Sequence, residues 1–207
     1  GTMKITLNSL FTALIMLALK KTAETGRGLK DWLVLEQIAN IRKNLGIQGG
    51  ISNYLAAFYT LQSTGDMPGL EGLAASLDSQ IKSVLSGREY LKELFLYPLV
   101  KYFPTKWVKR LYFKMLDKML QKPPLSSALS NLGKLDALLK LPADNILRSL
   151  SFVPTPNILA GHMWTVVSYR NLCSITLGYY TPMLSENIAT NLLRNFQTEL
   201  NLILEKN

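Results

Sequence analysis

The chain has 207 residues, with 23 Lys and Arg against 14 Asp and Glu and a net charge of +9. This length fits one sizeable domain or one lobe of a larger enzyme. A hydrophobic content of 48% with only 18% charged residues excludes a disordered chain. A single Cys and a single His exclude a disulfide framework, a zinc ribbon and an iron–sulfur cluster built from this chain alone. The composition therefore disfavours a self-contained hydrolase that depends on histidine, while carboxylate chemistry stays open.

The N-terminal segment admits two interpretations. Positive charge followed by an apolar run over 10–19 has the shape of a secretory signal. That run ends in two lysines with no small-residue cleavage site, and it is too short to span a bilayer. We therefore expect a buried helix with Thr6 as its N-cap, ending near Gly26. Residues 1–3 are interpreted as a cloning remnant and the start, and residues 4–207 as one domain.

The next elements follow from hydrophobic periodicity. Alternating side chains over 32–41 predict a strand, and a turn over 46–50 leads to a second predicted strand over 54–61. Apolar residues at helical spacing over 70–85 predict one face of a helix that ends at Gly87.

The second half of the chain adds further predicted elements. In chain order they are a proline-interrupted helical stretch from Arg88, a helix over 105–121, a short Ser-rich segment over 125–132, a strand over 146–153, hairpin strands over 163–169 and 172–180, and a helix from Ser185. The order of elements predicts an α/β fold, a two-layer sandwich with a mixed β-sheet covered by helices.

The predicted helix over 105–121 is strongly basic. Lys106, Lys109, Arg110 and Lys114 flank an apolar stripe that begins at Trp107. We expect this stripe to face the core and the cations to be solvated. The alternative is that the basic face docks onto an anionic membrane or an acidic protein. Nucleic acid is the weakest alternative, because no nucleic-acid-binding motif accompanies the charge.

Motifs for phosphate loops, dinucleotide binding, zinc proteases and serine hydrolases are absent from the sequence. Cys173 lies in a predicted strand and is expected to be a small buried hydrophobe rather than a nucleophile. His162 begins a predicted strand, where it can line a substrate pocket or donate a hydrogen bond. A role for His162 as catalytic base is the less favoured interpretation.

Four short motifs occur in order along the chain. They are Ile-Thr-Leu-Asn at 5–8, Ala-Asn-Ile-Arg at 39–42, Ser-Asn-Leu-Gly-Lys-Leu-Asp at 130–136, and Ser-Tyr at 168–169 before the last helix. Together they resemble the C-terminal half of the chloramphenicol-acetyltransferase-like superfamily. That superfamily includes alcohol acetyltransferases, polyketide-associated acyltransferases, wax-ester synthases and the condensation domains of peptide synthetases. The similarity covers residues 4–205.

The resemblance implies a two-lobed enzyme in which each lobe is an α/β sandwich and the active site is a tunnel between them. In such enzymes the N-terminal lobe carries an HHxxxDG motif, whose second His acts as general base on the hydroxyl or amine that attacks an acyl thioester. This sequence contains no HHxxxDG motif, and it lacks the DFGWG motif of the plant branch. The resemblance therefore implies an acceptor-side, C-terminal lobe without its catalytic N-terminal lobe, inactive on its own.

The resemblance also gives roles to individual positions. Arg42 corresponds to an arginine that ion-pairs with the aspartate of the HHxxxDG motif, for which a bidentate guanidinium is well suited. Ser130 and Asn131 match the Ser-Asn-Leu-Gly segment that borders the tunnel, where a hydroxyl or amide can donate to the developing oxyanion. The alternatives are a solvated arginine at a strand end and ordinary turn chemistry at Ser130 and Asn131.

The implied donor is acyl-CoA or a phosphopantetheinyl thioester, with no covalently bound cofactor and no metal. The implied partners are the missing N-terminal lobe and an acyl carrier protein, with a membrane surface as a further option and no nucleic acid. A cytoplasmic location, peripheral to a membrane if the basic helix docks there, agrees with this interpretation. Two competing hypotheses are a non-catalytic interaction module that docks through the basic helix and a lipid-binding domain.

Overall fold

The computed structural model describes residues 5–26, 31–40, 46, 55–88, 104–110, 114, 125–136, 147–156, 158–181 and 183–205. The elements are α1 (Leu7–Gly26), β1 (Trp32–Asn40), β2 (Leu55–Ser63), α2 (Leu70–Ser86), β3 (Ser127–Lys134), β4 (His162–Tyr169), β5 (Leu172–Tyr179) and α6 (Glu186–Leu204). A short helical segment also covers 105–110. The predicted elements over 32–41, 54–61, 70–85 and 163–180 are therefore confirmed in type and nearly in extent.

The strands form one mixed sheet in the order β2-β1-β3-β4-β5. β1 pairs in parallel with β3, and β3 pairs in parallel with β4. The edge strands are antiparallel to their neighbours, β2 to β1 and β5 to β4. The parallel pairs require long crossovers, and the chain supplies α2 and the residues that follow it between β2 and β3.

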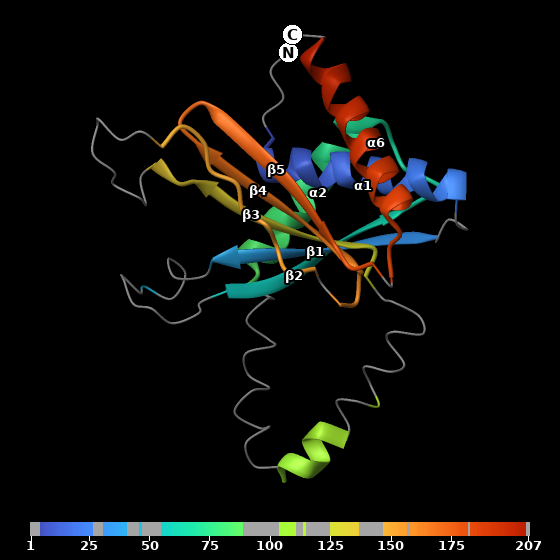
Figure 1. Cartoon of the computed structure of the whole chain (residues 1–207), viewed down its shortest axis with the longest axis vertical. Coiled ribbons are helices and arrows are strands. Elements are labelled where there is room, and N and C mark those ends of the chain that lie inside the picture. The colour runs from blue at the N-terminus through green and yellow to red at the C-terminus, as the bar shows by residue number, and fades with distance from the viewer. Residues whose placement is uncertain are drawn as a thin grey trace.

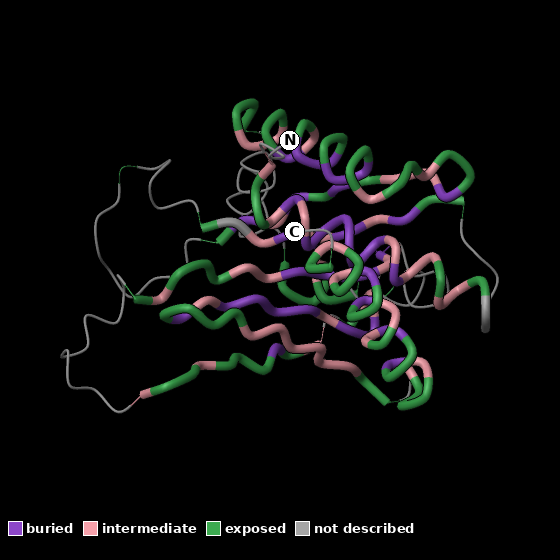
Figure 2. Tube along the Cα trace, turned by 90° about the horizontal axis from the view of Figure 1, so that it is seen from above, coloured by how far each residue is buried: buried purple, intermediate pink, exposed green. Residues whose placement is uncertain are grey.

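All three long helices cover the same face of the sheet, which makes a two-layer sandwich (Figure 1). The core joins helix residues such as Leu14 and Phe196 to Leu35, Leu129 and Trp164 of the sheet. The Trp164 and Phe196 rings lie 4.9 Å apart between centroids, and both side chains are buried. Figure 2 shows the buried positions concentrated in the helices and the central strands. The sheet thus has a helix-covered face and an opposite face, which we call the outer face, and the predicted α/β sandwich is confirmed.

The first turn of α1 is fixed by side chains from two helices. Ser9 N donates to Thr6 Oγ1 at 3.2 Å, so Thr6 is the N-cap that the sequence predicts. Asp78 of α2 accepts from Thr6 N at 3.2 Å and from Ser9 Oγ at 2.7 Å, and Lys82 Nζ lies 2.5 Å from its other oxygen. Lys82 and these donors hold the pKa of the Asp78 carboxyl well below its ordinary value. Because α1 supplies buried core residues, the secretory-signal interpretation is disfavoured.

The edge strand β2 is covered at one point by a side chain of α2. The Gln80 carboxamide accepts from Leu61 N and donates to Leu61 O, both at 3.1 Å. It thereby occupies the two backbone groups that a further strand would use at this position.

The prediction of a strand over 146–153 is wrong for the described residues 147–153, which form no strand pairing. The chain instead approaches the outer face of β5 at Pro154. A Cβ atom on Gly178 would lie only 2.7 Å from the Pro154 carbonyl oxygen. Glycine permits this close crossing, and proline cannot donate to a ladder, so the segment packs against the sheet without joining it.

Cys173 is exposed, so its predicted burial is also wrong. It lies near the start of β5, opposite Ser168 and next to the hairpin turn, at the edge of the sheet. Side chains further along β5, such as Ile175 and Leu177, reach the core. Local periodicity predicted an inward position but not how far the helices extend over it.

Several predicted features lie outside the described residues. They are the helical stretch from Arg88, most of the 46–50 turn and the helix over 111–121 apart from Lys114. Among the helices that the structure describes, none is both long and apolar enough to cross a membrane.

Candidate functional site

The two predicted oxyanion donors lie next to each other in β3 but face opposite sides of the sheet. Leu129 belongs to the helix-covered core, and strand alternation puts Asn131 on that same side. Ser130 therefore faces the outer side, in register with Ile38 of β1 and Thr165 of β4. The two adjacent residues cannot point into one site through their side chains.

The carboxamide of Asn131 is engaged in two hydrogen bonds. Its Oδ1 accepts from Gly133 N at 2.9 Å, a local side-chain-to-backbone turn. Gly133 has a φ of +68°, and the register of β3 against β4 shifts between these two residues. Asn131 thus shapes the bulge that interrupts β3, as the turn-chemistry alternative predicts.

The Nδ2 of Asn131 begins a chain of hydrogen bonds on the helix-covered side of the sheet. Asn131 Nδ2 donates to Asn8 Oδ1 at 3.2 Å, and Asn8 Nδ2 donates to Gln37 Oε1 at 2.6 Å. Gln37 Nε2 donates to Thr60 Oγ1 at 3.0 Å, and Thr60 Oγ1 donates to the Leu35 carbonyl at 3.4 Å. Gln37 and Thr60 are buried, so this chain satisfies polar groups that water does not reach. We call these four side chains the amide chain; it ties α1 to three strands.

On the outer face, three hydroxyl residues lie side by side on neighbouring strands. Ser130 of β3 is in register with Thr165 of β4, which is in register with Thr176 of β5. Neighbouring strands lie about 4.8 Å apart, so these hydroxyl side chains form a row that we call the hydroxyl row. Thr165 is only 1% exposed, and its Oγ1 has no hydrogen-bond partner among the described residues. A buried hydroxyl without a partner costs about 1–3 kcal/mol, so the Thr165 hydroxyl makes no stabilising hydrogen bond within the described fold.

Sequence reasoning missed Thr165 and Thr176. The signal was present, because a two-residue turn at Arg170 and Asn171 fixes the pairing of the predicted hairpin. That pairing places Thr165 opposite Thr176, as the structure has it. The neighbouring position of Ser130 needed the register of β3 against β4, which no local pattern gives.

His162, the only histidine of the chain, begins β4 and is 3% exposed. Its Nδ1 donates to the Ala160 carbonyl at 3.1 Å, and its Nε2 has no partner in the described part of the chain. Burial lowers the pKa of His162 to about 4, so the imidazole is neutral at physiological pH. His162 shares the helix-covered side with Trp164, two residues further along, and so lies on the opposite side of the sheet from Ser130. Arg42 lies outside the described residues, two positions beyond the end of β1.

The basic segment has a different character from the layered body. The helical segment 105–110 lies apart from the sandwich, toward one end of the molecule (Figure 1, light green). Trp107 is 75% exposed there, so the prediction that it faces the core is wrong. Periodicity predicted an apolar stripe, but no layer of the body lies over Trp107. Lys106, Trp107, Arg110 and Lys114 line an open hollow of about 450 Å³.

Comparison with known proteins gave matches only at the level of structure. No protein-family model and no curated protein matches the sequence. The fold matches the epimerization domain from the third module of tyrocidine synthetase B, with a TM-score of 0.52 and 13% identity over 98% of this chain. It also matches a solved structure that describes the molecular basis for condensation domain-mediated chain release from the enacyloxin polyketide synthase. The TM-score is 0.56, with 8% identity over 95% of this chain.

The chain has a condensation-domain-like fold. This agrees with the superfamily that the four motifs resemble, and at these identities the likeness is one of fold. The condensation-like chain spans 42% and 35% of the length of the two solved structures. It therefore corresponds to a portion of each of those larger proteins.

Proposed function

We propose that this chain is the acceptor-side lobe of an acyltransferase that moves an acyl group from a CoA or carrier-protein thioester to a hydroxyl or amine. The observation that carries the proposal is the hydroxyl row on the outer face of a condensation-like sheet. The amide chain on the other face has its hydrogen bonds made within the fold, whereas the buried Thr165 hydroxyl has none in the described chain.

The reaction sets the demand on this lobe. An acceptor oxygen or nitrogen attacks the thioester carbonyl carbon, a new C–O or C–N bond forms, and the C–S bond breaks. The proton of the acceptor leaves with the thiol, and the carbonyl oxygen carries negative charge in between. Ser130 Oγ is the proposed donor to that oxygen, and Thr165, beside it in register, is a second hydroxyl of the same row.

The general base is proposed to come from a second lobe. His162 is the only histidine of the chain, and it is buried on the helix-covered side, away from Ser130. The short span of this chain relative to the matched structures is compatible with a partner lobe. Arg42 is proposed to hold the aspartate of that lobe's HHxxxDG motif through a bidentate ion pair.

Thiol release tests the acyl-transfer proposal. The product of the natural gene, with any separate subunit that carries HHxxxDG, is assayed for free thiol from acyl-CoA and from acyl carrier protein. We expect Ser130→Ala to lower kcat about 100-fold with little change in KM, as for loss of one oxyanion donor. We expect Arg42→Ala to lower turnover as well, because the catalytic loop loses its ion pair.

The matched control is Ser174→Ala, which removes a hydroxyl from β5 opposite Val167, outside the hydroxyl row. It should leave turnover unchanged. Full turnover in Ser130→Ala would remove Ser130 from the mechanism. Absence of an HHxxxDG motif from the gene and from every subunit would sink the acyltransferase proposal itself.

A second candidate function is a docking module, which the exposure of Trp107 favours. A tryptophan that is 75% exposed beside exposed lysines and an arginine is unusual unless another surface covers it. In this alternative the condensation-like fold is a scaffold, and the chain attaches to an anionic partner, either a carrier protein or a membrane.

A further inference from the structure

The segment 104–114 is the most concentrated run of positive charge in the described chain. Its sequence, Pro-Thr-Lys-Trp-Val-Lys-Arg-Leu-Tyr-Phe-Lys, has four cations and neither Asp nor Glu. Lys106, Lys109, Arg110 and Lys114 are all exposed. None of them forms a salt bridge with another described residue, so their charge is available to an external anion.

The same segment carries aromatic side chains among the cations. Trp107 lies at 75% exposure, and Tyr112 and Phe113 follow in the sequence. Tryptophan is favoured at the boundary between water and lipid, because its ring is apolar and its N–H is polar. Four cations with an exposed tryptophan match the interfacial membrane-binding pattern better than a soluble surface, which rarely exposes this residue.

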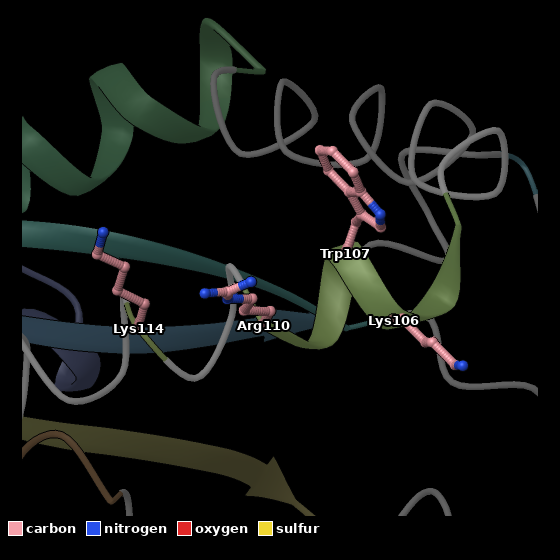
Figure 3. A pocket seen from close by; sticks show the side chains of 4 residues that line it. All are labelled: Lys106, Trp107, Arg110 and Lys114. Carbon is pink, nitrogen blue, oxygen red and sulfur yellow. The ribbon is translucent and has the colours of Figure 1, made fainter.

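The geometry of the four lining side chains argues against a small ligand. Figure 3 shows Trp107 and Lys106 pointing to opposite sides of the short helix, with Arg110 and Lys114 directed elsewhere again. A compact anion such as phosphate is held by donors that converge on one point. Donors that point in different directions instead fit a layer of mobile anionic groups, which can surround the segment on several sides.

We propose that the segment 104–114 attaches this chain to the surface of an anionic lipid bilayer. The proposal rests on the docking function given above and commits it to one partner. The helical part of the segment, 105–110, lies apart from the sandwich (Figure 1), so Trp107 can enter the headgroup region while the sandwich stays outside the bilayer. The attachment is peripheral, with cations at the anionic headgroups and the indole at the interface.

A bilayer fits this segment better than an acidic protein surface. Docking between proteins relies on a central buried anchor within a shaped contact area. Here the exposed tryptophan sits on a projecting helical segment of six residues, with no described strand or helix beside it to extend a contact area. A soft, laterally mobile anionic surface needs no such complementary frame.

Flotation with vesicles tests this proposal. The chain is mixed with vesicles of phosphatidylcholine alone and with vesicles that contain about 30% phosphatidylserine. We expect co-flotation only with the anionic vesicles, and less of it as salt rises, since exposed charges are screened. The double variant Lys109→Glu/Arg110→Glu should weaken binding by about tenfold or more.

Two further variants separate the mechanism from a general charge effect. Lys134→Glu/Arg148→Glu reverses two exposed cations elsewhere and changes the net charge by the same amount; it should float like the parent. Trp107→Ala should weaken binding while the salt dependence of the remainder is kept, because the cations are unchanged.

The failures are distinguishable. No flotation of the parent, equal flotation on neutral vesicles, or an equal loss in the Lys134/Arg148 control would overturn the membrane proposal. Binding to an acidic carrier protein without any vesicle binding would do the same while the docking function survives. Thiol release by the parent protein, measured from acyl-CoA without vesicles, needs no docking, so its absence would count against the acyl-transfer proposal alone.

Discussion

Adjacent residues of β3 show how differently the two faces of the sheet use polar side chains. Asn131, on the helix-covered face, forms hydrogen bonds through its carboxamide with Asn8 and with Gly133 of its own bulge. Ser130, on the outer face, stands beside Thr165, whose buried hydroxyl has no partner in the described chain. The first arrangement stabilises the sandwich, whereas the second leaves a buried polar group that the described fold does not pair.

The difference concerns how polar side chains are paired. On the covered face, the amide chain joins polar groups that are cut off from water, since an unpaired one would cost stability. On the outer face, the Thr165 hydroxyl carries that cost. The covered face carries it too, because Ser127 Oγ, His162 Nε2 and Trp164 Nε1 are buried without a partner in the described chain.

The largest effect is expected from acidification, through His162. Its pKa is about 4 in the fold, compared with 6.5 for a histidine that is fully exposed to water. The folded-state value is depressed, so the neutral form stabilises the fold above pH 6.5, and this stability is lost as the pH falls toward 4. Between pH 7 and pH 4 the chain should lose about 3 kcal/mol of unfolding free energy through this residue.

Urea unfolding at a series of pH values measures this loss. The variant His162→Leu has no titrating ring and should show a flatter profile over the same window. Asp78, whose pKa is lowered, contributes stability that is lost only below its ordinary value near 3.8, so its effect falls in a lower pH range. Parallel profiles for the parent and His162→Leu between pH 7 and 4 would contradict the buried, neutral state of His162.

The next effect is expected at the centre of the amide chain. Gln37→Leu removes the acceptor of Asn8 and the donor to Thr60, and Thr60 is fully buried. Groups left unpaired in the interior should cost about 1–3 kcal/mol of unfolding free energy.

Chemical denaturation of Gln37→Leu, beside the exposed control Gln197→Leu in α6, measures this cost. The control should stay within about 0.5 kcal/mol of the parent. If Gln37→Leu were as stable as the control, the covered face would not depend on its polar chain, and the contrast between the faces would collapse.

The smallest effect is expected on the outer face. Thr165→Val replaces the unpaired hydroxyl by a methyl group of similar shape, so stability should hold or rise by about 1 kcal/mol. Thermal unfolding of the variant checks this expectation. A clear loss of stability would show that the Thr165 hydroxyl serves the fold, and the outer face would then resemble the covered one.

The sequence predicted the layers well because hydrophobic periodicity reports which side of an element is covered. The alternation over 32–41 puts Leu33, Leu35 and Gln37 on one face, and the structure shows that this face is the buried one. The N-caps at Thr6 and Ser185 were predicted from their own side chains, and both accept the expected backbone N–H. These features depend on contacts close in sequence, where local chemistry is sufficient.

The failures concern which surface lies over a residue, which is a long-range property. Trp107 had the right spacing for a core stripe, yet no layer of the body covers it. The segment before Pro154 has strand-like composition, but its place against Gly178 prevents ladder pairing. The hydroxyl row needs two registers, and only that of the β4–β5 hairpin follows from local sequence, so Ser130 was predicted as a candidate without Thr165 and Thr176. The roles of Arg42, Ser130, Asn131 and His162 in catalysis or binding remain predictions.

Gln80 has a consequence for how copies of this chain behave together. A sheet can grow without limit when its edge offers a free backbone donor and acceptor to the next molecule. At Leu61 both groups are already held by the Gln80 carboxamide. The Gln80 side chain makes the two hydrogen bonds with Leu61 that a further strand would make there. A strand from another copy therefore cannot pair with β2 at Leu61 unless Gln80 moves.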